Sequence, residues 1–296
     1  MGPDDRQSTR RIVSIASVGE EILDPIRQAL ERARSARLSS KDASLDPFTP
    51  EASAGAEIVY REVKLSAAHL EAKRIVAHDP MLESGRYYDM LRTQVLQAMD
   101  DQGWQILAIT SPTAGCGKTV TACNLAMSIA RLPERSVLLI DMDMMKPKVA
   151  DYLGIEAKNG ILSVLQVRAG LSSTMVRTSI QDNELLVLPG EVCRSGSAEW
   201  MASQAMTSLI ETLKRDFRSY VIILDLPPVL IGDDVLAILP WLESILLVTA
   251  VGTSTLPDIK ECYKHLKSAP IVRVLVNKVS ERTESYYGYG YHYGAS

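Results

Sequence analysis

The stretch Ile109-Thr110-Ser111-Pro112-Thr113-Ala114-Gly115-Cys116-Gly117-Lys118-Thr119 decides how this chain is expected to fold. It joins an apolar run, Gln105–Thr110, to a helical pattern, Thr119–Arg131, through a loop that carries two glycines. Gly115 and Gly117 let the backbone curl so that several N–H groups point at one anion, and the new helix adds its positive N-terminal dipole. The stretch therefore predicts a phosphate-binding loop.

The end of this loop indicates what it binds. Lys118 would place its ammonium beside the outer phosphates of a nucleotide, and the hydroxyl of Thr119 would ligate Mg²⁺. Pro112 departs from the usual pattern, since it stands where G-x-x-x-x-G-K-[ST] has its first glycine. The alternative, a chance Gly-Lys-Thr at the start of a helix, is disfavoured by the strand pattern before the loop and the helical pattern after it.

Aspartates end two further apolar runs. Asp141 and Asp143 are two residues apart, so in extended chain they face the same side at about 6–7 Å, where like charges require a cation or a proton between them. Asp225 ends another run in the same way. One aspartate at a strand end is often only a turn former or a helix cap. Three of them with a phosphate loop favour a site at the carboxyl edge of the sheet, where they would converge with Lys118.

The remaining pattern predicts an α/β fold. Short uncharged runs rich in Val, Ile and Leu are typical of strands covered on both faces, and helical stretches separate them. This alternation predicts a mostly parallel sheet with helices on both faces and right-handed crossovers. The expected strands are Gln105–Thr110, Ser136–Ile140, Leu185–Leu188, Val221–Leu224, Ser244–Thr249 and Ile271–Val276, and the expected helices are Thr119–Arg131, Ala202–Asp216 and Asp258–Lys267.

Composition narrows the function classes. With 296 residues and a net charge of −4, nothing global draws the chain to nucleic acid. Four cysteines without a CxxC pair favour a reducing cytoplasm over a disulfide scaffold. No apolar run reaches the roughly 18 residues of a membrane span, so we expect any membrane contact to come through a partner.

The last 11 residues hold five of the 11 tyrosines, interleaved with glycine. Glycine adds backbone entropy and the chain ends here, so this segment is expected to be accessible. A low-complexity tail without chemistry, or a stacking surface for a nucleic acid or sugar, are alternatives. With a nucleotide site in the same chain, the simpler hypothesis is a phosphate acceptor, formed by Tyr286, Tyr287, Tyr289, Tyr291 and Tyr293.

From Arg74 to the C-terminus, the chain resembles the bacterial tyrosine kinases, the BY-kinases, that work with capsular and exopolysaccharide export. That family has a Walker A loop, a Walker A′ motif of apolar residues leading to Asp-x-Asp, and an Asp-x-Pro-Pro Walker B. Ser111–Thr119, Val137–Asp143 and Asp225–Pro228 match these motifs. Four further segments are similar to segments of that family: residues 74–80, Leu91-Arg92-Thr93-Gln94, Val276-Asn277-Lys278-Val279 and the glycine-spaced tyrosine cluster.

The resemblance implies a P-loop NTPase-type fold and roles for the site residues, with ATP and Mg²⁺ as cofactors. Thr119 and Asp225 would hold the metal, together with Asp141. Asp141 and Asp143 would handle metal and the tyrosyl hydroxyl, with Asp143 a candidate base for its proton. The implied catalytic residues are Lys118, Asp141, Asp143 and Asp225, and the implied nucleotide-binding residues are Gly115, Cys116, Gly117, Lys118, Thr119, Val120 and Asn277.

One departure concerns subunit contacts. The family typically carries Glu-x-x-Arg-x-x-Arg on its first helix, where subunits meet in a ring and the tail of one enters the site of its neighbour. This sequence has Arg86, Asp89 and Arg92, so the first two signs are inverted. Whether a ring forms by the usual contacts is therefore left open.

A second departure is Cys116, which replaces a frequent loop glutamate and should be tolerated because the loop binds through backbone N–H groups.

The resemblance also implies partners and a domain plan. We expect a membrane-spanning polysaccharide chain-length regulator as activator, phosphorylation of the tail in trans within a homo-oligomer, a tyrosine phosphatase, and no nucleic acid. The expected location is the cytoplasm, with recruitment to the inner face of the plasma membrane. The expected parts are a helical docking segment (1–38), a flexible linker (39–73), a P-loop kinase domain (74–281) and a flexible tyrosine-rich tail (282–296).

Two other functions stay open. A partitioning or division-site type ATPase shares the fold and the Asp-x-Asp strand, but its loop reads Lys-Gly-Gly-x-Gly-Lys-Thr, and Thr113 stands here at its first lysine. An ATP-binding scaffold of polysaccharide assembly with weak catalysis is the second alternative, which the inverted helix motif favours.

Overall fold

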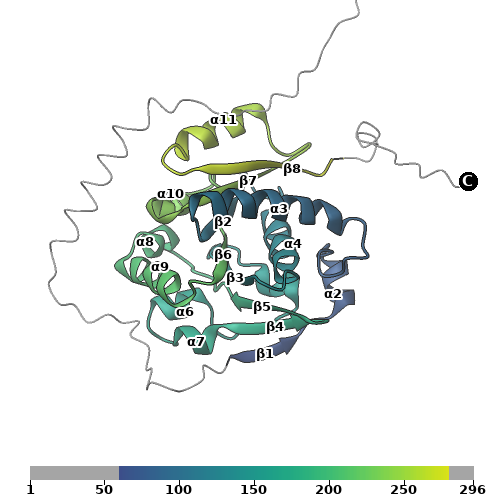
Figure 1. The fold of residues 1–296 in the computed structure, drawn as a ribbon. Helices are drawn as coiled ribbons and strands as arrows, with labels where there is room; N and C mark the ends of the chain where they lie inside the picture. The colour runs from purple at the N-terminus through teal and green to yellow at the C-terminus, as the bar shows by residue number, and fades with distance from the viewer. Residues whose placement is uncertain (1–59, 280–296) are drawn as a thin grey trace, which may run out of the picture. The chain divides into compact units, whose positions relative to one another are not determined.

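The computed structural model describes residues 60–279, which form alternating strands and helices (Figure 1). In chain order the elements are β1 (Arg61–Lys64), α2 (Ala67–Ala72), α3 (Gly85–Gln102), β2 (Ile106–Thr110), α4 (Lys118–Ala130), β3 (Ser136–Asp141), α5 (Val149–Leu153), α6 (Ile161–Leu165), α7 (Leu171–Thr174), β4 (Val176–Ile180), β5 (Asn183–Leu188), α8 (Ser197–Met201), α9 (Gln204–Asp216), β6 (Tyr220–Asp225), α10 (Asp234–Ile238), a 3₁₀ turn (Leu239–Trp241), β7 (Ser244–Ala250), α11 (Leu256–His265) and β8 (Ile271–Asn277).

The strands of the described region form one eight-stranded sheet in the order β1-β4-β5-β3-β6-β2-β7-β8. All neighbouring pairs are parallel except β4 and β5, which form an antiparallel hairpin. The expected mostly parallel α/β sheet is therefore confirmed. The six expected strands and three expected helices are present with ends shifted by at most two residues.

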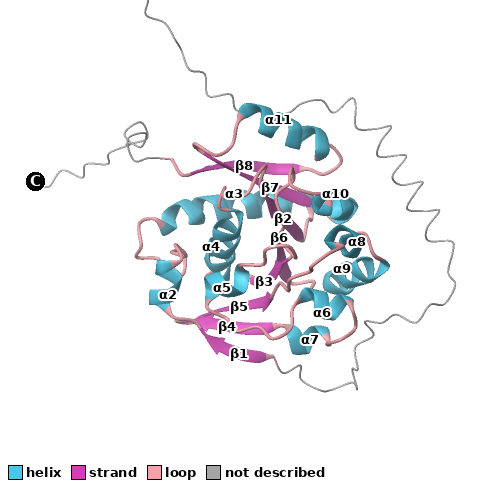
Figure 2. Ribbon diagram, turned by 180° about the vertical axis from the view of Figure 1, so that it is seen from behind, coloured by secondary structure: helices cyan, strands magenta, loops and turns pink. Residues whose placement is uncertain are grey.

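Helices cover both faces of the sheet. Figures 1 and 2 show α6 to α10 on one side and α2 to α5 on the other. The period of two along β2 explains why both faces are apolar, because Ile106 and Ala108 enter the core of one face and Leu107 and Ile109 the core of the other.

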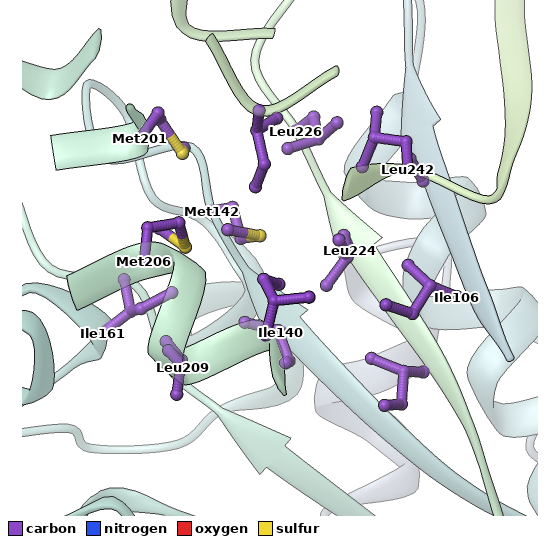
Figure 3. Packing of buried hydrophobic residues seen from close by; sticks show 14 of the residues in the cluster. Ile106, Ile140, Met142, Ile161, Met201, Met206, Leu209, Leu224, Leu226 and Leu242 are labelled. Atoms are coloured by element: carbon purple, nitrogen blue, oxygen red, sulfur yellow. The ribbon is translucent and has the colours of Figure 1, made fainter. Parts of the chain in front are cut away.

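The apolar runs of β3 and β6 form part of the hydrophobic core beneath α9. Figure 3 shows Ile140 and Leu224 on neighbouring strands, with Met206 and Leu209 of α9 packed over them. Each of these side chains is excluded from solvent. Burial of such a side chain stabilises the fold by about 1.5–3 kcal/mol.

Residues 61–72 correct the expected domain plan, which placed them in a linker. Leu65 N donates to Ser179 O at 2.8 Å beyond the β1–β4 pairing, and Leu70 of α2 is fully buried. These residues belong to the sheet domain, so the expected boundary at residue 74 is wrong. The sequence of β1, Arg-Glu-Val-Lys, does not predict a strand because it lacks an apolar run. A short strand at the edge of a sheet is exposed and tolerates charged side chains. The expected docking segment (1–38), residues 39–59 of the expected linker and the tail (282–296) lie outside the described residues.

β4 was also missed. Its sequence, Val-Arg-Thr-Ser-Ile, alternates buried and half-buried positions, so it lacks the continuous apolar run of the central strands.

Among residues 60–279, none of the helices is both long and apolar enough to cross a membrane.

Candidate functional site

The phosphate loop lies between β2 and α4, as expected. Gly115 and Gly117 have φ of 82° and 95°, in the left-handed region that favours glycine. A Cβ on Gly117 would lie 2.3 Å from Nδ2 of Asn277, which donates to the carbonyl of Cys116 at 3.0 Å. The end of β8 therefore contacts the loop, and a side chain at residue 117 would have to displace the Asn277 amide.

Lys118 and two of the expected aspartates converge beside this loop. The Lys118 Nζ lies 2.9 Å from Oδ2 of Asp143 and 3.5 Å from Oδ1 of Asp225. The hydroxyl of Thr119 donates to Oδ2 of Asp225 at 2.6 Å. The Lys118, Asp143 and Asp225 side chains are only 12%, 8% and 1% exposed, so their charges interact with little screening by water.

Asp141 is fully buried and forms no ion pair with Lys118 among the described contacts. Its Oδ1 accepts the N–H of Asp143 at 3.1 Å, and its Oδ2 accepts those of Lys148 at 2.8 Å and Val149 at 2.9 Å. Asp143 in turn accepts the N–H of Lys146 at 3.0 Å. Asp141 therefore orders the turn that carries Asp143.

Burial and mutual repulsion set the electrostatics of the cluster. Desolvation, followed by the charge of Asp225, raises the pKa of Asp141 to about 7. Burial also raises the pKa of Asp225, against the opposing effect of Lys118. Burial alone would lower the pKa of Lys118, but Asp225 and Asp143 raise it above its ordinary value. One ammonium thus pairs with two carboxylates, and the carboxyl group of Asp141 is near enough to act on its charge, so the site favours additional positive charge.

The donor set fits a nucleotide with Mg²⁺. Carboxylate and hydroxyl oxygens are the hard ligands that Mg²⁺ takes, and it usually keeps waters and substrate phosphates as its other ligands. Within residues 60–279, no group of three or more His, Cys, Asp or Glu side chains is arranged to hold a metal ion. Thr119 and Asp225 would accordingly hold the ion only together with phosphate oxygens.

The other expected nucleotide-binding residues are placed as follows. Cys116 is buried, and its Sγ lies 3.3 Å from Oγ of Ser254, a neighbour that the sequence did not indicate. Val120 lies in the first turn of α4, where its carbonyl accepts the amide of Asn124 at 2.8 Å. The expected phosphoacceptors, Tyr286, Tyr287, Tyr289, Tyr291 and Tyr293, lie outside the described residues.

Sequence reasoning missed the loop after β5. A Cβ on Gly190 would lie 2.8 Å from Cγ of Asp141, so this loop forms a wall of the site. Glu191 accepts N–H groups from Gly160 and Ser163 at 3.1 and 2.9 Å and thereby joins the loop to α6. The only signal in the sequence is the Pro-Gly pair that ends the β5 run.

The altered motif on α3 is engaged within the chain. Asp89 accepts hydrogen bonds from Ser128 at 2.6 Å and Arg131 at 3.0 Å, and Arg92 donates to Asp89 at 3.3 Å. Arg92 also donates to the carbonyl of Ser128 at 2.8 Å. Two of the three motif residues therefore join α3 to α4, whereas Arg86 is exposed.

Comparison with known proteins agrees with this geometry. Residues 107–288 match the family model of the CobQ/CobB/MinD/ParA nucleotide binding domain. The chain is 32% identical over 227 residues to the putative tyrosine-protein kinase EpsB of Ralstonia nicotianae, covering 76% of this chain and 29% of that protein. It is 31% identical over 203 residues to the tyrosine-protein kinase CpsD of Streptococcus pneumoniae serotype 4, covering 68% of this chain and 86% of that protein.

Among solved structures, the BceF tyrosine kinase domain is similar with a TM-score of 0.61 and 27% identity, covering 74% of this chain and 92% of that one. The chain spans less than a third of the length of the EpsB relatives and most of the length of CpsD. The chain therefore belongs to the CobQ/CobB/MinD/ParA nucleotide-binding family and, within it, to the bacterial tyrosine-protein kinases, the BY-kinases.

Proposed function

We propose that this chain is an ATP-dependent protein-tyrosine autokinase that phosphorylates its own C-terminal tyrosine cluster. The observation that carries the proposal is the convergence of Lys118, Asp143 and Asp225 beside a glycine loop that opens α4. Family membership supports the same reaction class. Such a site works by positioning and by neutralising charge rather than through a covalent intermediate.

The residues of the site would divide this work. The N–H groups from Gly115 to Thr119 and the Lys118 ammonium bind and orient the phosphates. Thr119 and Asp225 would hold Mg²⁺, which, when bound, neutralises charge on the transferred group. Asp143 would accept the hydroxyl proton of the acceptor tyrosine as that oxygen bonds to phosphorus and the bond to the nucleoside diphosphate breaks. The ordinary pKa of tyrosine is about 10, so a base within reach promotes this step.

The cellular setting is part of the same proposal. By resemblance to the family, the kinase would regulate polymerisation or export of a capsular polysaccharide or exopolysaccharide. A membrane-spanning chain-length regulator would activate it at the inner face of the plasma membrane, and a tyrosine phosphatase would reset it. Residues 1–38 would serve as the docking segment, and a homo-oligomer would allow phosphorylation of the tail in trans.

The experiment is to incubate purified protein with ATP and Mg²⁺, with and without a cytoplasmic peptide of a candidate regulator, and to map phosphate by mass spectrometry. We expect phosphate on Tyr286–Tyr293 in the wild type and none in Lys118→Met. A variant with the five tail tyrosines changed to Phe is the matched control, since it keeps the rings and removes the acceptor oxygens. ATP-dependent dimers without phosphotyrosine would instead support a partitioning-type ATPase.

The role of Asp143 needs its own variant. Asp143→Asn should bind ATP, because Lys118 and the loop remain, and should lose transfer by about a hundredfold or more. Full autophosphorylation by Asp143→Asn with normal ATP binding would show that Asp143 is not the base. Bound ATP without any transfer in the wild type, even with activator, would support the scaffold alternative.

A further inference from the structure

The loop after β5 packs closely against Asp141. This loop, residues 189–193 (the Gly190 loop), begins beside the end of β3, because β5 and β3 are neighbours in the sheet. A Cβ on Gly190 would lie 2.8 Å from Cγ of Asp141 and 2.5 Å from Cβ of Pro147. Carbon atoms in close-packed interiors do not approach one another so closely, so the backbone of Gly190 is already in contact with both residues. The Gly190 loop therefore fits against the turn after β3 without room for a larger residue.

The turn after β3 is the one that carries Asp143. Asp141 accepts the N–H of Asp143 at 3.1 Å, and Gly190 abuts the carboxyl group that accepts it. On the other side of Asp143, the carbonyl of Met144 accepts the N–H of Cys193 at 2.8 Å. The Gly190 loop therefore contacts the residues on both sides of Asp143 and restricts where its carboxylate can lie.

Glu191 anchors the Gly190 loop to α6. Its Oε2 accepts the N–H of Gly160 at 3.1 Å, the N–H of Ser163 at 2.9 Å and the Ser163 hydroxyl at 2.5 Å. Its Oε1 accepts a hydrogen bond from Arg168 at 2.7 Å. Burial alone would raise the pKa of Glu191, but the hydrogen bonds from Ser163 and Arg168 lower it below its ordinary value. Hydrogen bonds to a charged carboxylate are stronger than those between neutral groups, so Glu191 holds the loop firmly beside Asp141.

We propose that Glu191 is a positioning residue of the kinase, which acts on Asp143 through the Gly190 loop and Asp141. The inference rests on the proposed function and adds a residue that lies outside the nucleotide-binding motifs. All four hydrogen bonds of the Glu191 carboxylate go to residues 160–168, so its effect on the reacting centre is indirect. When this carboxylate is removed, the Gly190 loop loses its anchor on α6, and Asp143 is no longer held at a fixed distance from the acceptor hydroxyl.

This role predicts a loss of phosphate transfer rather than of nucleotide binding. The phosphate loop and Lys118 lie between β2 and α4, whereas the anchor of Glu191 is at α6. A displacement of about 1 Å at a reacting group can lower a rate by about a hundredfold. Loosening of the turn that carries Asp143 should therefore slow transfer while the nucleotide still binds.

Glu243 offers a matched control at the other end of the sheet. Its carboxylate accepts the N–H groups of Gln105 and Ile106 at 2.7 and 2.8 Å and also binds Lys214. These backbone groups lie at the start of β2, whereas the phosphate loop follows its end. Glu243→Ala therefore removes a similar set of hydrogen bonds to Glu191→Ala, but not at the edge of the sheet that carries the site.

The experiment compares full-length Glu191→Ala, Glu191→Gln and Glu243→Ala with the wild type. It measures the maximal rate of phosphotyrosine formation at saturating ATP, the Kd of a fluorescent ATP analogue, and hydrogen–deuterium exchange of the N–H groups in residues 143–149. We expect Glu191→Ala to lower the maximal rate by about tenfold or more and to speed this exchange, with Kd unchanged within about twofold. Glu191→Gln keeps an acceptor oxygen for Ser163 and should retain at least about a third of the wild-type rate. Glu243→Ala should keep the wild-type rate and the slow exchange of residues 143–149.

A wild-type rate in Glu191→Ala would overturn the positioning role while the proposed function stands. Equal losses of rate in Glu191→Ala and Glu243→Ala would overturn it as well, because they would show a general effect of lower stability. If Glu191→Ala does not fold, Ser163→Ala decides, since it removes one of the four hydrogen bonds: a rate lowered by about threefold supports the role, and an unchanged rate overturns it. If the wild type forms no phosphotyrosine at all, the proposed function fails and this inference falls with it.

Discussion

Asp141 is the residue whose surroundings differ most from its sequence pattern. Asp141 and Asp143 share one face of an extended run, which suggested a pair that holds one cation. Of these two aspartates, only Asp143 forms an ion pair with Lys118, whereas Asp141 is fully buried and accepts three backbone N–H groups. The geometry favours ordering of the Asp143 turn as the principal contribution of Asp141.

The raised pKa of Asp141 predicts a pH-dependent stability. Its folded-state pKa of about 7 exceeds the ordinary carboxyl value of 3.8, so the folded state binds this proton more tightly than the unfolded chain does. The stabilisation is complete below about pH 4 and is lost as the pH rises through 7. Between pH 6 and 8, we expect the nucleotide-free protein to lose about 1 kcal/mol, or roughly 2–4 °C in Tm, by differential scanning calorimetry.

Asp141→Asn is the control for this prediction, because an amide does not titrate. Its Tm should fall less between pH 6 and 8 than that of the wild type, by the same roughly 2–4 °C. Identical pH profiles for the two proteins would mean that Asp141 is ionised throughout this range.

The two loop glycines form a matched pair. Both have positive φ, so alanine at either costs about 1–2 kcal/mol in the loop conformation. At Gly117 the new Cβ would also lie 2.3 Å from Asn277, whereas at Gly115 nothing lies within 4 Å. We therefore expect Gly117→Ala to weaken nucleotide binding at least about tenfold more than Gly115→Ala, measured as Kd for a fluorescent ATP analogue. Equal effects would show that Asn277 yields readily.

At the scale of elements, the motif Arg86, Asp89 and Arg92 on α3 contributes two of its residues to the contact between α3 and α4. Asp89 and Arg92 of α3 bind each other and the end of α4 through Ser128 and Arg131. Since α4 begins at Lys118, this polar contact fixes the helix that presents the site. It also occupies Asp89 and Arg92 within one chain.

Asp89→Ala should therefore destabilise the fold. It leaves Arg92 and Arg131, whose side chains are about 15% exposed, without their carboxylate. We expect a loss of about 2–3 kcal/mol, measured as a lower midpoint of urea unfolding. Asp100→Ala is the comparison, because its ion pair with Arg135 is exposed and should contribute less than about 1 kcal/mol. A loss no larger than that of Asp100→Ala would contradict the structural role of Asp89.

At the scale of the whole molecule, one sheet edge gathers residues from distant parts of the chain. The phosphate loop follows β2, Asp143 follows β3, Asp225 ends β6 and Asn277 ends β8. In a parallel sheet every carboxyl end lies on the same edge, so four separated motifs meet without a dedicated binding domain. The fold also brings the end of β8 to the phosphate loop, where Asn277 donates to the carbonyl of Cys116.

The sequence by itself determined the fold class, the central strands and the phosphate loop, because fully buried strands read as continuous apolar runs and the glycine loop follows from local backbone geometry. It also indicated that Lys118, Asp143 and Asp225 converge, since strand ends align. Only the tertiary structure decided what depends on neighbours distant in sequence: β1 and β4, the burial of Asp141, the wall at Gly190 and the Asp89 pairing. Strand order, and with it the surroundings of each carboxyl group, arises from long-range packing, which local pattern does not encode.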